Sequence, residues 1–337
     1  GPVLGLDELR ESLASKWSRQ YQGKVSNQNV AITSGCNQAF CASISSFTGE
    51  NDEVILPTPW YFNHHMWLQM AGVKSIPLDT DANMNPIIEK AEALITDRTR
   101  AIVLVSPNNP SGAIYSNQLL QKFFDLCKSN QIRLIIDETY KDFHPNASQP
   151  HTLLENNNWD QVLTILYSFS KTYRMTGHRI GALLTSKENL IEIEKALDTF
   201  TVCPPQLGQY AANWGLNNLE AWAAERRTEI LQRAKHFSEK FQPLSAAGWS
   251  LKGCGAYFAF VEHPFEDGSN ILAPLILRDQ GILLMPGTMF YPKHNPLGSR
   301  SFRIAFANID KNKISTLLER LKDLSYQRLN SKNNMIN

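Results

Sequence analysis

The sequence predicts an α/β protein with a large domain on a mostly parallel sheet, followed by a smaller C-terminal α+β domain. In the N-terminal part, short apolar runs of strand length alternate with longer amphipathic segments of helical period. This alternation is typical of a parallel sheet covered by helices. After Pro204-Pro205 the pattern changes to one long charged-and-apolar helix and then to mixed strands and helices. A chain of 337 residues is long enough for both domains.

The expected elements follow from these patterns in chain order. The strands expected in the large domain are residues 53–56, 74–77, 101–105, 133–136, 162–167 and 181–185. The helices expected between them are residues 37–46, 86–94, 118–129 and 190–199. A helix over 219–241 is expected to lead into the second domain, so we place the domains at residues 1–215, with an N-terminal helix, and 216–337. The second domain is expected to hold strands near 256–262, 282–285 and 301–307, a helix near 273–280 and a final helix from Ile314.

Composition excludes several classes of protein. The net charge is +1 with acids and bases mixed along the chain, so no nucleic-acid partner is expected. No apolar run approaches the length of a membrane span, so no membrane association is expected. The five cysteines are scattered without a Cys-x-x-Cys pair, which predicts no metal site and free thiols in a reducing compartment. These features favour a cytoplasmic enzyme or binding protein.

Lys171 is the most informative residue because of its surroundings. It follows the apolar run 162–167 and the hydroxyls of Ser168 and Ser170, and Arg179 stands eight residues later. A lysine amine attacks an aldehyde only when it is partly deprotonated and held in place. A serine and a fixed cation beside such an amine suit an anionic group next to an imine, as pyridoxal 5'-phosphate (PLP) requires. An ordinary solvated lysine is the alternative, so the interpretation depends on the other motifs.

Two motifs after strands offer groups for an anionic ligand. Gly35, Cys36 and Asn37 follow an apolar run and open a helix, where backbone N–H groups can receive a phosphate; a simple helix cap by Ser34 is the alternative. Asn109 lies in a turn fixed by two prolines and a glycine, which can aim its side chain at a ligand oxygen. A plain tight turn would look similar.

Four further residues could supply other groups that one planar, charged ligand needs. Asp137 and Tyr140 follow the strand 133–136, where a carboxylate can hold a pyridine nitrogen protonated and a phenol can bond an oxygen; a metal-binding or helix-capping Asp is the alternative. Tyr61 could cover the face of a planar cofactor, or pack in the core. Arg303 interrupts an apolar strand, where its guanidinium needs a substrate carboxylate or a structural acid.

With these motifs in one order, the chain resembles the fold-type I PLP-dependent aminotransferases of class I and II, the aspartate aminotransferase superfamily. The resemblance runs from Gly5 to the final helix. It is carried by Ser-x-Ser-Lys with Arg179 eight residues on, by Asn-Pro-Ser-Gly and by Asp-x-x-Tyr. The large domain is then expected to contain the seven-stranded type of sheet found in that family.

The resemblance implies a role for each position. Lys171 would carry the cofactor and shuttle the substrate proton, and Asp137 would hold the pyridinium proton. Tyr140 and Asn109 would bond the phenolic oxygen, and Tyr61 would stack on the ring. The phosphate would be held by Ser168, Arg179 and the backbone of Gly35, Cys36 and Asn37. The substrate α-carboxylate would be clamped by Arg303, with Asn109 beside it.

The implied activity is transamination between an L-amino acid and a 2-oxo acid, in a homodimer. A C–S β-lyase on the same fold and a non-catalytic PLP-binding protein are the alternatives. Relatives that prefer dicarboxylates often use a partner-subunit arginine from the segment between Arg179 and Arg226, where this sequence has none. Neutral or aromatic donors are therefore favoured, aided by Trp60, Tyr61, His64 and His65. Members of that family usually carry a substrate-covering arm ahead of the position of Gly5. The sequence lacks this arm, as either a truncated or a naturally short chain would.

Overall fold

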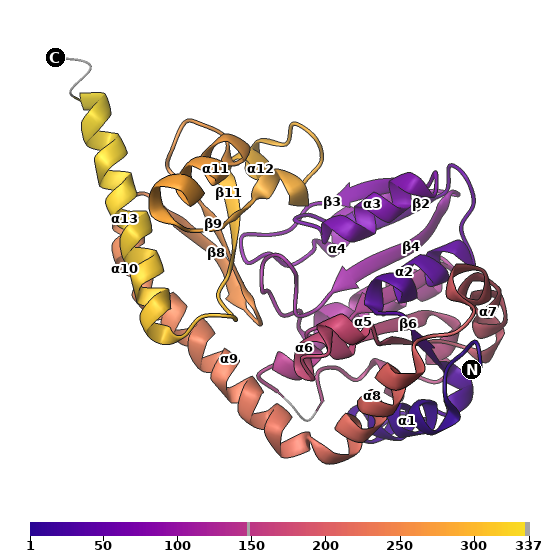
Figure 1. Cartoon of the computed structure of the whole chain (residues 1–337). Coiled ribbons are helices and arrows are strands. Elements are labelled where there is room, and N and C mark those ends of the chain that lie inside the picture. The colour runs from indigo at the N-terminus through magenta and orange to yellow at the C-terminus, as the bar shows by residue number, and fades with distance from the viewer. Residues whose placement is uncertain (147–148, 334–337) are drawn as a thin grey trace.

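The computed structural model of the chain describes residues 1–146 and 149–333 and has two lobes (Figure 1). The N-terminal lobe contains a seven-stranded sheet and the C-terminal lobe a four-stranded sheet. The long helix α9 (Glu220–Lys240) runs from one lobe to the other (Figure 1). The predicted α/β class, with a smaller α+β part after the large sheet, is confirmed.

The large sheet has the strand order β1-β7-β6-β5-β4-β2-β3. Its strands are β1 (Val30–Thr33), β2 (Glu53–Pro57), β3 (Lys74–Leu78), β4 (Thr99–Val105), β5 (Arg133–Asp137), β6 (Leu163–Ser168) and β7 (Gly181–Leu184). Strands β3, β2, β4, β5 and β6 pair in parallel, whereas β7 is antiparallel to both β6 and β1. The carboxyl ends of the parallel strands therefore share one edge of the sheet with the amino end of β7.

Helices cover both faces of this sheet because successive strand residues point to opposite sides. On β4, Ile102 and Leu104 belong to one hydrophobic core, and Ala101 and Val103 belong to the other. The first core packs against α1 (Asp7–Tyr21), α5 (Asn117–Ser129) and α8 (Gln206–Asn218). The second packs against α2 (Cys36–Ser45), α3 (Phe62–Met70) and α7 (Lys187–Thr201). The short helix α4 (Ile88–Leu94) joins β3 to β4.

The C-terminal lobe packs helices against an antiparallel sheet of order β10-β11-β9-β8. Its strands are β8 (Ser250–Gly255), β9 (Phe258–Glu262), β10 (Met285–Pro286) and β11 (Ser301–Ala305). Its helices are α10 (Gln242–Ala246), α11 (Ser269–Gln280), α12 (Pro296–Arg300) and α13 (Lys311–Asn333). Their core includes Trp249, Val261, Phe302 and Ile314, together with Phe237 of α9.

Most predicted elements are confirmed. The predicted ranges did not include β1, α3, α8, α10 and α12. Two other differences have physical reasons. The strand expected over 282–285 is wrong: Ile282 and Leu284 are buried apolar residues of an irregular segment, and only Met285–Pro286 pairs with β11. Strand β8 was not predicted, because its Gly253-Cys254-Gly255 end lacks a strand composition. The boundary at residues 215/216 falls inside α8 and stays a prediction. Across the described parts of the chain, no helix is long and apolar enough to cross a membrane.

Candidate active site

A cavity of about 450 Å³ lies at the carboxyl edge of the large sheet and is lined on its other side by the C-terminal lobe. Every predicted site residue except Gly35 lines it. From the large lobe these are Cys36, Asn37, Tyr61, Asn109, Asp137, Tyr140, Ser168, Lys171 and Arg179. The C-terminal lobe contributes Tyr257, Phe258 and Arg303. Residues from seven separate segments of the sequence are thus brought to one place.

One end of the cavity is built from the start of α2 and from Arg179. Gly35 precedes α2 with φ 92°, and a Cβ at this position would collide with the Arg179 guanidinium. Only glycine therefore allows the arginine to lie against the helix N-terminus. Arg179 reaches this corner because it precedes β7, the strand that begins at the shared edge. The helix N-terminus and the guanidinium together favour an anion at this corner.

Asp137 is a buried carboxylate that the chain keeps ionised. Its Oδ1 accepts hydrogen bonds from the backbone N–H of Thr139 at 2.9 Å and from the Cys36 thiol at 3.6 Å, and its Oδ2 lies 3.3 Å from His64 Nε2. Burial opposes the charge, but His64 and Thr139 outweigh burial and lower the pKa of Asp137. Burial, and then the charge of Asp137, raise the pKa of the Cys36 thiol. This thiol therefore stays protonated and donates to Asp137.

Two phenols frame the space in front of Asp137. Tyr61 precedes α3, and its hydroxyl donates to Asn37 Oδ1 at 3.4 Å. Tyr140 is packed edge-on against Tyr257 and Phe258. Burial is the main cause that raises the pKa of both phenols, so both stay protonated and able to donate at neutral pH.

Lys171 is half-buried in the short helix α6 (Phe169–Thr172), which begins directly after β6. Its Nζ lies 5.8 Å from the centroid of the Tyr140 ring. Burial lowers the pKa of Lys171, and the charges of Arg303 and Arg179 lower it further, while Asp137 acts in the opposite direction. A larger fraction of this amine is therefore neutral than for a surface lysine, as nucleophilic attack requires.

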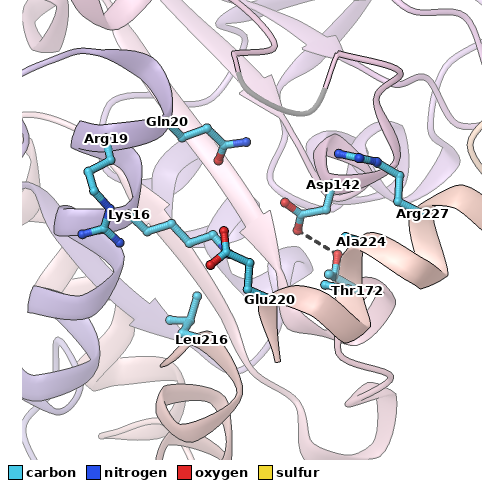
Figure 2. Close-up of a pocket in the computed structure, with 10 residues that line it drawn as sticks. Lys16, Arg19, Gln20, Asp142, Thr172, Leu216, Glu220, Ala224 and Arg227 are labelled. Carbon is cyan, nitrogen blue, oxygen red and sulfur yellow. Dashed lines mark hydrogen bonds between the residues drawn. The ribbon is translucent and has the colours of Figure 1, made fainter. Parts of the chain in front are cut away.

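Asp142 bonds to α6 and was not among the residues predicted for the site. Figure 2 shows its bond with Thr172, whose hydroxyl donates to Asp142 Oδ2 at 2.8 Å. Tyr167 donates to the same oxygen at 2.7 Å, and Lys141 Nζ lies 2.9 Å from Oδ1. Asp142 therefore fastens the residue next to Lys171. Its only sequence signal is an acid five residues after Asp137, which alone is uninformative.

His64 does not lie where the sequence predicted it, beside an aromatic substrate. It is buried, stacks on Phe40 with ring centroids 4.0 Å apart, and faces Asp137 instead of the open cavity. Trp60 and His65 stack on each other at 4.2 Å and do not line the cavity. Of the four residues expected to aid an aromatic substrate, only Tyr61 lines it.

Arg303 is a half-buried cation without an acidic partner among the described residues. Its guanidinium donates to Asn109 Oδ1 at 2.8 Å and to the Met285 sulfur, and it lies over the rings of Phe258 and Phe290. Its Nε is buried without a hydrogen-bond partner. The structural ion pair considered as an alternative is therefore absent within residues 1–146 and 149–333, and Arg303 is free to hold a carboxylate.

The charges around the cavity define what it can bind. Lys171, Arg179 and Arg303 supply positive charge, whereas Asp137 is the only acid among its lining residues. Such an excess favours a ligand with two anionic groups, one near Arg179 and one near Arg303. Within the same described ranges, no group of three or more His, Cys, Asp or Glu could hold a metal ion.

Comparisons with known proteins agree with this arrangement. The family model described as "Aminotransferase class I and II" matches residues 1–321. An aromatic aminotransferase of Arabidopsis thaliana is 29% identical over 299 residues, which are 85% of this chain and 73% of that protein. An aspartate aminotransferase of Pyrococcus abyssi is 26% identical over 314 residues, covering 91% of this chain and 79% of its own.

Solved structures show the same fold. An aromatic aminotransferase from Pyrococcus horikoshii superposes with a TM-score of 0.87 at 26% identity, covering 97% of this chain and 88% of that one. A double mutant of the Thermus thermophilus aspartate aminotransferase gives a TM-score of 0.86 at 25% identity, covering 96% of this chain and 83% of that one.

Proposed function

This chain belongs to the aminotransferase class I and II family, and from that premise we propose that PLP binds in the cavity at Lys171 and that the donor is a neutral or aromatic amino acid. The family is known to use PLP, and its members transfer amino groups between amino acids and 2-oxo acids. The observation that carries the proposal is the convergence of Lys171, Asp137, Arg179 and Arg303 on one cavity.

The residues present fit the cofactor. Lys171 would carry it, and the ionised Asp137 would face its ring nitrogen. Tyr140 and Asn109 would bond its phenolic oxygen, and Tyr61 would cover the ring. The phosphate would lie in the anion corner formed by Arg179, Ser168 and the backbone of Gly35, Cys36 and Asn37. The lack of a side chain at Gly35 supports this placement, since a Cβ there would collide with the Arg179 guanidinium.

When bound, PLP supplies an electron sink for charge that develops at the substrate α-carbon. The side chains of the protein would orient the substrate and transfer its proton. Arg303, supported by Asn109, would hold the substrate α-carboxylate and so fix the orientation of the α-carbon. The Lys171 amine, whose pKa is lowered mainly by burial, would accept and return the α-proton.

Aromatic walls support the proposed donor class. Phe62, Tyr257 and Phe258 line the cavity beside Tyr61, and they offer apolar contact to an uncharged side chain. The segment between Arg179 and Arg226 holds no arginine that a second subunit could use for an acidic side chain.

A homodimer is proposed with a contact that includes α8 and the end of α7. Leu207, Tyr210 and Trp214 lie on one face of α8, and Phe200 and Val202 precede it; their exposed fractions range from 40% to 85%. Large apolar side chains exposed on one helix face are typical of subunit interfaces. Light scattering on the wild type and on Trp214→Glu tests this, and a monomeric wild type would refute it.

Neither alternative, the C–S β-lyase or the non-catalytic PLP-binding protein, is favoured, because relatives of this chain are named aminotransferases. All five cysteines are free thiols in the structure, which supports the proposed cytoplasmic location.

A donor screen tests the proposal. We expect phenylalanine or methionine to convert the bound cofactor to its amine form without an acceptor, with kcat/KM above that for aspartate. A higher kcat/KM for aspartate would overturn the donor class. Steady release of pyruvate and ammonia from cysteine would support the lyase instead.

A further inference from the structure

A second cavity, of about 460 Å³, adjoins the candidate active site. The two cavities share Lys171, Tyr257 and Ala305 as lining residues. The second is also lined by three arginines, Arg174, Arg226 and Arg233, and is called the arginine cavity below. Its apolar lining residues include Phe143, Ile230 and Leu283.

Its positive charge is only partly compensated. Glu229 is the one acid among its lining residues, and it divides its oxygens between Arg226, at 2.6 Å, and Arg233. Glu225 lies 3.8 Å from Arg226 and is well exposed. Three guanidinium groups therefore face one lining carboxylate and one peripheral one, which leaves an excess of positive charge.

The three arginines differ in how far the chain satisfies them. Arg233 also donates to the Ala307 carbonyl, so it joins α9 to the turn that follows β11. Arg226 keeps a buried Nε without a hydrogen-bond partner. Arg174 is exposed, lies 5.8 Å from the Trp222 ring and forms no ion pair with any described residue. A purely structural Arg–Glu–Arg link explains Arg233 but neither Arg174 nor the free Nε of Arg226.

We propose that the arginine cavity is an anion subsite, in which Arg226 and Arg174 hold a carboxylate or phosphate group beside Lys171. Guanidinium groups suit both anions because their N–H donors match paired oxygens. The anion has two sources. It is either the terminal carboxylate of a 2-oxo acid that accepts the amino group at Lys171, which rests on the proposed function, or a separate small anion.

The neighbouring residue Arg227 provides a matched control. It lies on the same helix, α9, but lines a different cavity, together with Lys16, Glu220 and Asp142 (Figure 2). Replacing Arg226 or Arg227 by Gln removes the same charge from adjacent positions. Arg174→Gln is a second test variant, and it removes no ion pair seen in the described structure.

Thermal unfolding of the cofactor-loaded protein tests the separate anion. Inorganic phosphate is titrated against sodium chloride of equal ionic strength. We expect a saturable rise of Tm with phosphate in the wild type and in Arg227→Gln, and a roughly tenfold weaker response in Arg226→Gln and Arg174→Gln.

Steady-state kinetics test the substrate carboxylate. For a 2-oxo acid with a terminal carboxylate, we expect KM to rise about tenfold in Arg226→Gln and Arg174→Gln. For an acid of equal length that ends in a methyl group, KM is expected to stay unchanged. Either response supports the subsite and identifies its source. If both variants match Arg227→Gln in both measurements, the subsite is refuted, whereas activity of the wild type in the same assay tests the proposed function separately.

Discussion

Asp137 and Glu138 are adjacent buried carboxylates with opposite surroundings. Tyr21 donates to one oxygen of Glu138 at 2.6 Å, and His151 Nε2 lies 2.6 Å from the other. The Leu153 N–H donates to Nδ1 of His151, which makes Nε2 the donor to Glu138. All three side chains are at most 2% exposed. Asp137 instead lines a cavity with an excess of positive charge.

The difference in surroundings indicates that the charge of Glu138 is structural and that of Asp137 is functional. The chain itself satisfies Glu138, which ties α1 to the end of β5. Asp137 is held ionised by His64 and Thr139, yet it faces space that a ligand can fill. A buried charge whose partners all come from the chain is expected to affect stability. A buried charge that faces a cavity is expected to affect chemistry.

The largest effect is expected from Asp137→Asn. The amide keeps the shape and can still accept from Thr139, but it removes the negative charge that would face the ring nitrogen. We expect kcat/KM for the best donor to fall about a thousandfold, while the free energy of unfolding changes by less than about 1 kcal/mol. Steady-state kinetics and urea unfolding check both. A large loss of stability with unchanged kcat/KM would contradict this, because Asp137 would then have the same structural role as Glu138.

Glu138→Gln should show the reverse. One of the two donors, Tyr21 or His151, then meets an amide N–H instead of an oxygen. We expect the free energy of unfolding to fall by about 3 kcal/mol, with kcat/KM per folded molecule nearly unchanged. Urea unfolding measures the free energy of unfolding. Active-site titration gives the concentration of folded enzyme, by which kcat/KM is corrected. A specific loss of kcat at full folding would place Glu138 in the chemistry.

Arg303→Lys extends the comparison to cations. Lysine keeps the charge but lacks the planar guanidinium, which can bind a carboxylate through two hydrogen bonds. We expect KM for the donor to rise roughly thirtyfold, or about 2 kcal/mol, with little change in Tm because no described acid pairs with Arg303. Arg233→Lys is the control: its partners are Glu229 and the Ala307 carbonyl, so it should lower Tm and leave KM unchanged.

His64→Phe should give the smallest effect. Phenylalanine keeps the stack on Phe40 but cannot bond to Asp137. Because His64 helps to lower the pKa of Asp137, its loss raises that pKa, and the carboxylate becomes protonated at a higher pH. The acid limb of the kcat/KM profile should therefore move to higher pH. His65→Phe, whose native side chain stacks on Trp60, should leave the limb in place.

Much of this arrangement could be predicted from the sequence, because strand ends are recognisable from apolar runs and polar residues follow them. Lys171, Asp137, Asn109 and Tyr140 were assigned to one site in this way. The contacts of His64 and Asp142 were not predicted, since they depend on the fold. His64 was expected beside the substrate but reaches Asp137 from α3, and Asp142 accepts a hydrogen bond from Thr172 of α6. The strand expected at 282–285 failed because a buried apolar run does not reveal whether its backbone has a pairing partner.

The arginine cavity could not be predicted for a similar reason. Arg174, Arg226 and Arg233 come from two distant segments, and an arginine on a long charged helix is ordinarily a solvated residue. Only the structure shows that they lie around one cavity that shares Lys171 with the candidate active site.

The most direct test of the central claim is to identify the residue that carries the cofactor. Borohydride reduction of the PLP-loaded protein fixes the cofactor to its amine, and peptide mass spectrometry then locates the modified lysine. We predict modification of Lys171, and none at any lysine in Lys171→Ala. Modification of a different lysine, or none in the wild type, would contradict the assignment of the cavity as the active site.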